Sequence, residues 1–411
     1  MKQVIILSLI LILIIATASF LVSYSITNNN TDATPFYVGV TFCGNTTAEA
    51  KLLIDKVKDY TNLFVLQSGP ISNNETATNE ICDYAVASGL NIIVNLGVYR
   101  TSSRNWTWQL PWFESAKQRY GDRFIGAYYD DEPAGIQMDY NWFNFFLNYS
   151  SFFEGRPSVS PLHQIFADLE EAMANVTRPV SRDYDIEAEF FQIILENNQG
   201  HNSLKDAGIK TFTSDYVLYW FDYKGGYDVM LAQFGWNNSY IQDIALVRGA
   251  ARMQNKPWGA IITWKYDEPP YLDSGEEIYN QMHTAYEAGA EYVIIFNYPQ
   301  IEGNPYGTLT DEHFEALEKV WNEVTQNPRN RRDASQAEAA LVLPKNYGWG
   351  MRHPEDWIWG FWGPDEKSPQ IWINSRKLLA YYGAWLDIVY DDPASPVTGK
   401  YPRIYYWNQT I

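Results

Sequence analysis

Cysteine is scarce in this chain, with only Cys43 and Cys82 among 411 residues. A disulfide framework needs several pairs, so the stability of this protein does not depend on disulfides. The two thiols either pair with each other or stay free and buried, and the sequence leaves both alternatives open. A chain of this length can bury a large core and is long enough for more than one domain.

Positive charge is also in deficit, because 30 Lys and Arg stand against 49 Asp and Glu, for a formal net charge of −19. Phosphate groups are bound by Lys and Arg, so this balance argues against nucleic acid and polyphosphate partners. The simplest explanation of the acidity is a solvated surface.

Several catalytic signatures are missing. The sequence contains no G-x-S-x-G elbow and no P-loop, and no glycine pair follows its last two apolar runs to grip a phosphate. None of the five histidines ends an expected strand, which disfavours a catalytic zinc site; they are His163, His201, His283, His313 and His353. We therefore predict no metal and no cofactor.

The longest apolar run lies at the N-terminus. Residues 4–24 are uncharged and long enough to cross a bilayer, and Lys2 ahead of them favours a main domain outside the cell. We predict a membrane anchor in residues 1–24 and a polar tether in 25–35; a cleaved signal segment is the alternative and would make the protein secreted. Glycosylation sequons fit export, at Asn29, Asn45, Asn74, Asn105, Asn148, Asn175, Asn237 and Asn408.

Eight strand-like apolar runs alternate with helical patterns between residues 36 and 328. Several are continuously apolar, as parallel strands covered on both faces are. This order predicts an α/β fold, a (β/α)8 TIM barrel, with a doubly wound open sheet as the alternative. The expected strands are 37–42, 63–68, 91–98, 124–130, 209–215, 227–235, 258–265 and 291–298.

Two segments do not fit a simple barrel. A helical insertion is expected after the fourth strand, at about 137–206, whereas the fifth and sixth strands are joined by a short connection. A polar, basic linker at 329–339 leads to a small α/β C-terminal region at 340–411, which we expect to dock on the barrel. A role of this region in assembly is a further alternative.

Three acids follow the fourth strand in the stretch "AYYDDEPAG": Asp130, Asp131 and Glu132. Residues at the carboxyl ends of barrel strands build the active site, so these acids would surround its mouth. Extended geometry would place Asp130 and Glu132 on one face and Asp131 on the other, with Pro133 ending the strand.

A second acidic stretch, "TWKYDEPP", follows the seventh strand and contains Asp267 and Glu268. The fourth and seventh strands are opposite in an eight-stranded ring, so the two sets of carboxylates would face each other, as glycoside hydrolysis requires. Glu132 is the candidate general acid, and Glu268 or Asp215 the candidate nucleophile or base. Such acids also serve as helix caps or solvated loop residues, and the first cluster could instead bind Ca²⁺.

On these motifs the region from 36 to 325 resembles the TIM-barrel glycoside hydrolase superfamily. In its largest clan a Glu ending strand four, often before Pro, is the acid/base, which Glu132 in "DEP" matches, although Asp131 stands where Asn is expected. Glu268 matches the strand-seven nucleophile loosely, because "WKY" delays it. The Asp-x-Glu of chitinase-like families is similar to residues 130–132, but "LAQFGW" lacks their strand-six Tyr. Over its whole length the chain also resembles archaeal membrane-anchored surface proteins, which imply no activity.

Other side chains at the expected mouth are candidate substrate ligands. Aromatic faces stack on sugar rings, while amides and carboxylates bind hydroxyl groups. Trp264 and Tyr266 are equally interpretable as core residues, and Lys265 would keep a neighbouring carboxylate ionised. The candidates are Asp130, Gln67, Asn95, Tyr216, Gln233, Trp264, Lys265, Tyr266 and Asn297.

These patterns lead to two functional hypotheses. The first is an extracytoplasmic glycoside hydrolase that acts on neutral or amino-sugar glycans through paired carboxylates. The second is a non-catalytic glycan-binding or cell-surface structural protein that keeps the barrel fold. In both, the partners are a carbohydrate and, through residues 4–24, the membrane.

Overall fold

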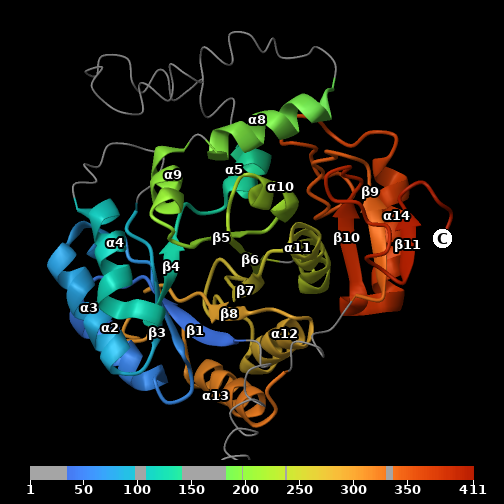
Figure 1. The fold of residues 1–411 in the computed structure, drawn as a ribbon. Helices are drawn as coiled ribbons and strands as arrows, with labels where there is room; N and C mark the ends of the chain where they lie inside the picture. Colours follow the sequence, from blue (N-terminus) through green and yellow to red (C-terminus); the bar gives the residue numbers. More distant parts are fainter. Residues whose placement is uncertain (1–34, 98–107, 141–181, 197, 237, 330–336) are drawn as a thin grey trace, which may run out of the picture.

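The computed structural model describes residues 35–97, 108–140, 182–196, 198–236, 238–329 and 337–411. Eight strands form a closed ring in which every neighbouring pair is parallel and the last strand pairs with the first. The predicted (β/α)8 TIM barrel is thus confirmed, and the open sheet is excluded (Figure 1). The strands are β1 Tyr37–Phe42, β2 Leu63–Leu66, β3 Asn91–Val94, β4 Phe124–Tyr128, β5 Thr211–Asp215, β6 Val229–Phe234, β7 Trp258–Ile262 and β8 Tyr292–Ile295.

Helices surround the ring. Their starts follow local chemistry: Thr46 and Glu49, for example, form a reciprocal capping box at the first turn of α2. The helices are α2 Thr47–Val57, α3 Glu75–Ala87, α4 Gln109–Tyr120, α5 Pro133–Tyr140, α8 Tyr184–Glu196, α9 Gln199–Asp206, α10 Tyr219–Lys224, α11 Tyr240–Gln254, α12 Gly275–Glu287 and α13 Asp311–Gln326. Single 3₁₀ turns occur at Ile71–Asn73, Gly121–Arg123 and Gly383–Trp385.

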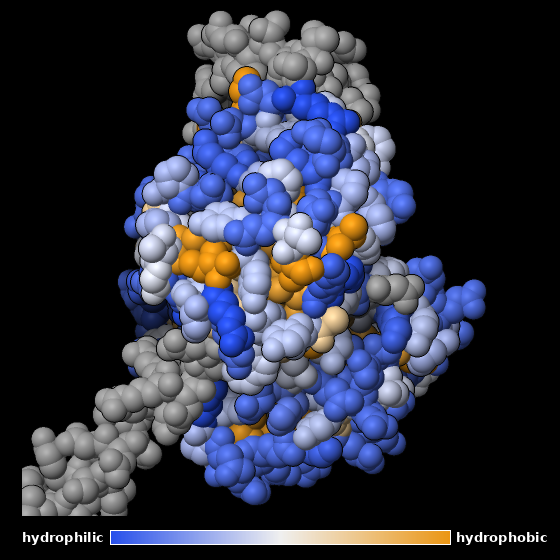
Figure 2. Space-filling model, turned by 90° about the vertical axis from the view of Figure 1, so that its right-hand side faces the viewer, coloured by the Kyte–Doolittle hydropathy of each residue, from blue (hydrophilic) through white to orange (hydrophobic). Residues whose placement is uncertain are grey.

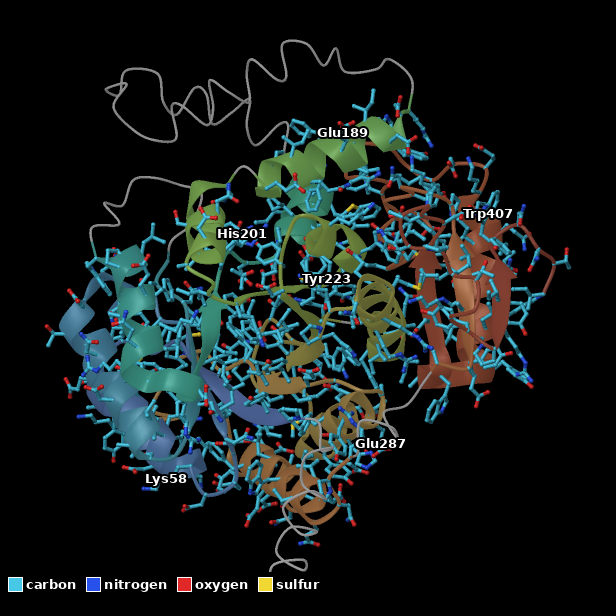
Figure 3. All side chains as sticks on the ribbon, in the orientation of Figure 1. Lys58, Glu189, His201, Tyr223, Glu287 and Trp407 are labelled. Atoms are coloured by element: carbon cyan, nitrogen blue, oxygen red, sulfur yellow. The ribbon has the colours of Figure 1, made fainter. Side chains whose placement is uncertain are left out.

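Two hydrophobic layers result from the alternation of side chains along the strands. On β2, Leu63 and Val65 belong to the cluster inside the barrel, whereas Phe64 and Leu66 belong to the cluster that packs against the helices. Side chains of the inner cluster fill the ring, while Lys58 and Glu287 lie at the periphery (Figure 3). The barrel is a packed core, and only its rim is left for binding.

The connections on either side of β5 differ in size. Helices α5, α8 and α9 lie between β4 and β5, and α8 and α9 fall within the predicted insertion at about 137–206, of which residues 141–181 and 197 lie outside the described residues. Between β5 and β6 the chain forms only the six-residue helix α10.

The C-terminal region forms a small parallel sheet of order β10-β9-β11, with β9 Ala339–Leu343, α14 Ser368–Tyr382, β10 Leu386–Tyr390 and β11 Arg403–Tyr406. It lies against α11 (Figure 1). The approach is close, since a Cβ on Gly249 would stand 2.5 Å from the carbonyl oxygen of Ile388. Arg248 donates to Asp387 at 2.7 Å, and both side chains are buried. On the side of α14 and β11 the surface is mainly hydrophilic, with a few small hydrophobic areas (Figure 2).

The predicted membrane attachment requires a correction. Residues 4–24 and most of the tether, 25–34, lie outside the described residues. Within the part of the chain that the structure describes, no helix is long and apolar enough to cross a membrane. The described residues thus give no support to the predicted membrane partner or to the predicted location outside the cell, and we do not retain either.

The buried pair between α11 and β10 generates a stability prediction. Arg248→Met leaves Asp387, which has no exposed surface, without its cation. We expect a loss of about 3–5 kcal/mol in the free energy of unfolding, measured by urea denaturation.

Lys51→Met is the control for this variant. Lys51 and Glu80 form an ion pair whose side chains are 34% and 44% exposed, so we expect a loss of at most about 1 kcal/mol. Equal losses of unfolding free energy in the two variants would contradict a larger contribution of the Arg248–Asp387 pair to stability.

Candidate active site

A cavity of about 190 Å³ opens at the carboxyl ends of the barrel strands. Its lining comes from β2, β4, β5, β6, β7 and β8 and from the residues that directly follow them, which is where barrel enzymes place their chemistry. The lining residues are Gln67, Tyr128, Asp131, Glu132, Ser214, Gln233, Trp236, Ile261, Thr263, Trp264, Phe296 and Tyr298.

The acidic stretch after β4 is a turn and does not continue the strand. The strand ends at Tyr128, and Asp130 and Glu132 adopt left-handed backbone conformations with φ of 57° and 51°. For residues with a side chain, this region costs roughly 1–2 kcal/mol each. The expected alternation is therefore wrong: Asp131 and Glu132 line the cavity, Asp130 does not, and Pro133 begins α5.

Asp215 holds this turn in place from the end of β5. Its carboxylate accepts the backbone N–H groups of Ala134 at 2.7 Å and Gly135 at 3.0 Å, in the first turn of α5, and that of Tyr216 at 2.8 Å. Burial raises the pKa of Asp215, as does the charge of Glu132, while the backbone donors lower it. Asp215 does not line the cavity, so the predicted role as nucleophile or base has no geometric support.

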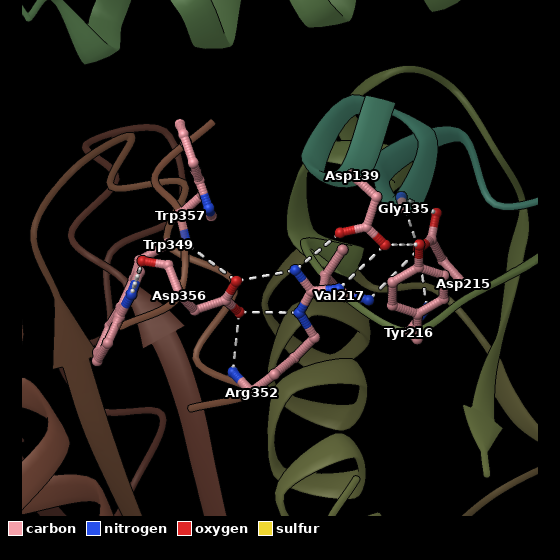
Figure 4. Close-up of polar contacts among 9 residues, drawn as sticks. All are labelled: Gly135, Asp139, Asp215, Tyr216, Val217, Trp349, Arg352, Asp356 and Trp357. Carbon is pink, nitrogen blue, oxygen red and sulfur yellow. Dashed lines mark hydrogen bonds and ion pairs between the residues drawn. The ribbon is translucent and has the colours of Figure 1, made fainter. Parts of the chain in front are cut away.

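A second network joins this turn to the C-terminal region (Figure 4). The hydroxyl of Tyr216 donates to Asp139 on α5, and Arg352 bridges Asp139 and Asp356. A Cβ on Gly135 would stand 2.4 Å from the Tyr216 ring, so only glycine allows this packing. Tyr216, predicted as a substrate ligand, thus belongs to the scaffold.

Asp131 and Glu132 are connected through neutral donors. Asp131 Oδ1 accepts hydrogen bonds from the hydroxyl of Tyr128 and from Ser214 Oγ, the latter at 3.0 Å. Gln233 Nε2 donates to Ser214 Oγ at 2.9 Å and to Glu132 Oε1 at 2.8 Å. The described residues leave Asp131 Oδ2 and Glu132 Oε2 without a hydrogen bond, so each carboxyl group retains one oxygen for a ligand.

Burial sets the protonation of this pair. It raises the pKa of Asp131 to about 7, helped by the charge of Glu132 and opposed by the Tyr128 and Ser214 hydroxyls. Burial also raises the pKa of Glu132, against the Gln233 hydrogen bond. Two adjacent carboxylates with no cation among the described lining residues retain a proton near neutral pH.

Aromatic residues form another part of the lining. The Trp264 ring centroid lies 5.7 Å from that of Tyr298 and 6.3 Å from that of Phe296. Trp264 Nε1 is buried and has no hydrogen-bond partner among the described residues. Trp236 and Tyr298 are each 41% exposed, so their faces are accessible at the rim.

The acids after β7 do not face Glu132 across the cavity. Asp267 and Glu268 are exposed and absent from its lining. Lys265 is bound to Asp273 at 2.6 Å, and Tyr266 is 43% exposed beside it. The four-residue delay after β7 carries the carboxylates past the rim, so the predicted pairing of Glu132 with Glu268 is not present.

The two remaining predicted ligands have structural partners. Asn95 Oδ1 accepts the N–H of Gly97 at 2.8 Å, and Asn297 Oδ1 accepts that of Thr308 at 2.9 Å. Of all the predicted site residues, the cavity therefore contains Gln67, Glu132, Gln233 and Trp264.

Sequence reasoning missed Tyr128, Ser214, Trp236, Phe296 and Tyr298 as lining residues. Tyr128 and Ser214 lie in the last residues of β4 and β5, a position that could have identified them. As regards metals, no group of three or more His, Cys, Asp or Glu within the described ranges could hold an ion, so the Ca²⁺ alternative has no support there. Cys43 and Cys82 are both free and buried.

Comparisons with known proteins concern the barrel. No protein-family model matches the chain, and no curated protein matches it. A truncated 3-deoxy-D-arabino-heptulosonate 7-phosphate synthase from Thermotoga maritima is 7% identical, with 71% of this chain and 88% of that one covered and a TM-score of 0.35. Orotidine 5'-monophosphate decarboxylase from Methanocaldococcus jannaschii is 11% identical, with 70% of this chain and 98% of that one covered and a TM-score of 0.32. A spore coat polysaccharide biosynthesis protein from Bacillus subtilis is 6% identical, with 73% of each chain covered and a TM-score of 0.37.

The geometry of the cavity corrects the predicted extracytoplasmic glycoside hydrolase, and we do not retain its glycan-binding alternative. Glu268 lies outside the cavity and Asp215 is bound to backbone amides, so the required opposed carboxylates are missing. No protein-family model, of glycoside hydrolases or of any other family, matches the chain. We also withdraw the carbohydrate partner.

The raised pKa of Asp131 predicts a pH-dependent stability. Its folded value is about 7 against an ordinary 3.8, so the folded state holds an extra proton between these values and stability falls as pH rises through this window. Asp131→Asn removes the effect, and we expect it to stabilise the protein by on the order of 2 kcal/mol at pH 8 and by almost nothing at pH 4.

Urea denaturation at the two pH values measures this difference. Asp267→Asn, at an exposed acid outside the cavity, is the control and should change stability equally little at both. The same effect of Asp131→Asn at pH 4 and pH 8 would contradict the raised pKa.

Proposed function

We propose that the cavity is the active site of an enzyme that moves protons to and from a small organic molecule, as in isomerisation or elimination. The observation that carries this proposal is the pair of Asp131 and Glu132, which Ser214 and Gln233 connect by hydrogen bonds and which have one oxygen each available in the cavity. An acid–base group is most effective when its pKa is near the working pH, and that of Asp131 is raised to about 7.

The two carboxyl groups have different roles in this proposal. Asp131 Oδ1 is occupied by two hydroxyl donors, so its proton resides on Oδ2 and is delivered from there. Glu132 is held by the Gln233 amide through Oε1, and its Oε2 is the base. Tyr128, Ser214 and Gln233 are positioning residues, because they orient the two carboxyl groups and do not need to touch the substrate.

The lining also limits the class of substrate. Its twelve described residues include no Lys, Arg or His, so it offers no counter-charge to a phosphate or carboxylate. A cavity of about 190 Å³ has room for a small molecule.

Deuterium exchange tests the proposal without a known substrate. A panel of small ketones, amino ketones and amino alcohols is incubated with the protein in D₂O, and deuterium incorporation at carbon is followed by mass spectrometry. We expect the wild type to label at least one compound and Glu132→Gln to lower the rate about 10²–10⁴-fold, the usual contribution of a general base.

Glu268→Gln makes the same chemical change at an exposed acid outside the cavity, and should retain the wild-type rate. In the wild type we expect the exchange rate to fall above pH 7 as Asp131 loses its proton. In Asp131→Asn this fall of the rate with pH should be absent. An equal rate in Glu132→Gln and wild type, or no labelled compound, would refute the proposal.

A further inference from the structure

The polar atoms that the cavity leaves open are mainly acceptors. Asp131 and Glu132 each have one carboxyl oxygen without a hydrogen bond among the described residues. Gln233 is only 5% exposed, and its amide donates through Nε2 while no hydrogen bond of the described residues uses Oε1. Gln67 Oε1 is buried and has no partner in the described part of the chain. A ligand that satisfies these four oxygens must supply N–H or O–H donors.

Two cationic side chains near this end of the barrel, those of Lys265 and Arg352, form ion pairs with acids outside the cavity. Lys265 is paired with Asp273 at 2.6 Å. Arg352 is divided between Asp139, at 2.9 Å, and Asp356, at 2.8 Å (Figure 4). Neither lines the cavity, so the acceptor oxygens face no cation from the described lining.

The aromatic part of the lining suits the same kind of ligand. Trp264, Phe296 and Tyr298 are in mutual contact, and Trp236 lies in the lining as well. The faces of Trp and Tyr attract ammonium and guanidinium-like groups, and bind the apolar part of such a molecule. The formal net charge of −19 also favours the approach of cations.

We propose that the cavity binds a small organic cation, whose ammonium or amidinium N–H groups donate to Asp131, Glu132, Gln233 and Gln67 while its apolar part contacts Trp264 and Tyr298. This inference rests on the proposed function, because it names the substrate class of the same site. The bound cation supplies the counter-charge that the two acids lack.

The protonation of the pair makes binding pH-dependent. The groups that face Asp131 are Tyr128, Glu132, Asp130 and the thiol of Cys43, and Asp215 and Asp139 act on Glu132. All of these are neutral or negative near pH 7, so none replaces the cation. Affinity should therefore rise from pH 5.5 to pH 8 as Asp131 loses its proton.

Calorimetric titration of the full chain with benzamidine and benzamide tests the inference. The two probes have nearly the same shape, but benzamidine is a cation throughout this pH range. We expect benzamidine to bind at least tenfold more tightly than benzamide at pH 8. Glu132→Gln should remove most of this preference, and Glu268→Gln, outside the cavity, should retain it.

Equal affinities for the two probes, no binding of either, or tighter binding of benzoate would overturn the inference. These measurements need no turnover, so they are independent of the deuterium experiment. Selective benzamidine binding without deuterium exchange would refute the proton-transfer enzyme alone. Exchange with equal probe affinities would refute the cationic ligand alone.

Discussion

The geometry of the cavity depends on the carboxylate of Asp215. It is the last residue of β5, has no exposed surface, and accepts the first backbone N–H groups of α5. This interaction attaches the turn after β4 to the neighbouring strand, and Glu132 N–H adds a bond to the carbonyl of Ser214 at 3.0 Å. With the turn held on both sides, the left-handed conformations of Asp130 and Glu132 are maintained against their cost.

Burying two adjacent acids without a cation lowers the stability of the folded protein, whereas acids paired with a cation would lower it less. The structure offers Asp131 and Glu132 the hydroxyls of Tyr128 and Ser214 and the amide of Gln233, all neutral. Neutral donors orient a carboxylate without lowering its pKa as far as a cation does, so Asp131 titrates near neutral pH. The missing counter-charge is thus the observation from which we infer both the proposed proton-transfer chemistry and the proposed preference for a cationic ligand.

The C-terminal region contributes to the same end of the barrel. Its Arg352 pairs with Asp139 on α5 and lies over the Tyr216 ring at 5.6 Å, while Arg248 holds β10 against α11. The region was expected to dock on the barrel, but its contact with the helix that follows Glu132 had no sequence signal. Arg352 and Asp139 are 213 residues apart, and nothing local relates them.

The sequence by itself determined the alternation of eight apolar runs with helices, which favours a barrel over an open sheet, and it placed acids at the end of β4. Glu132, Gln233, Gln67 and Trp264 were found because they end strands or directly follow them. Only the tertiary structure decided which acid enters the cavity. A left-handed turn anchored to Asp215 directs Asp131 inward, and the longer turn after β7 leaves Glu268 in solvent. The directions of the Asp131 and Glu268 side chains depend on contacts between segments far apart in the sequence, which a local sequence pattern does not encode.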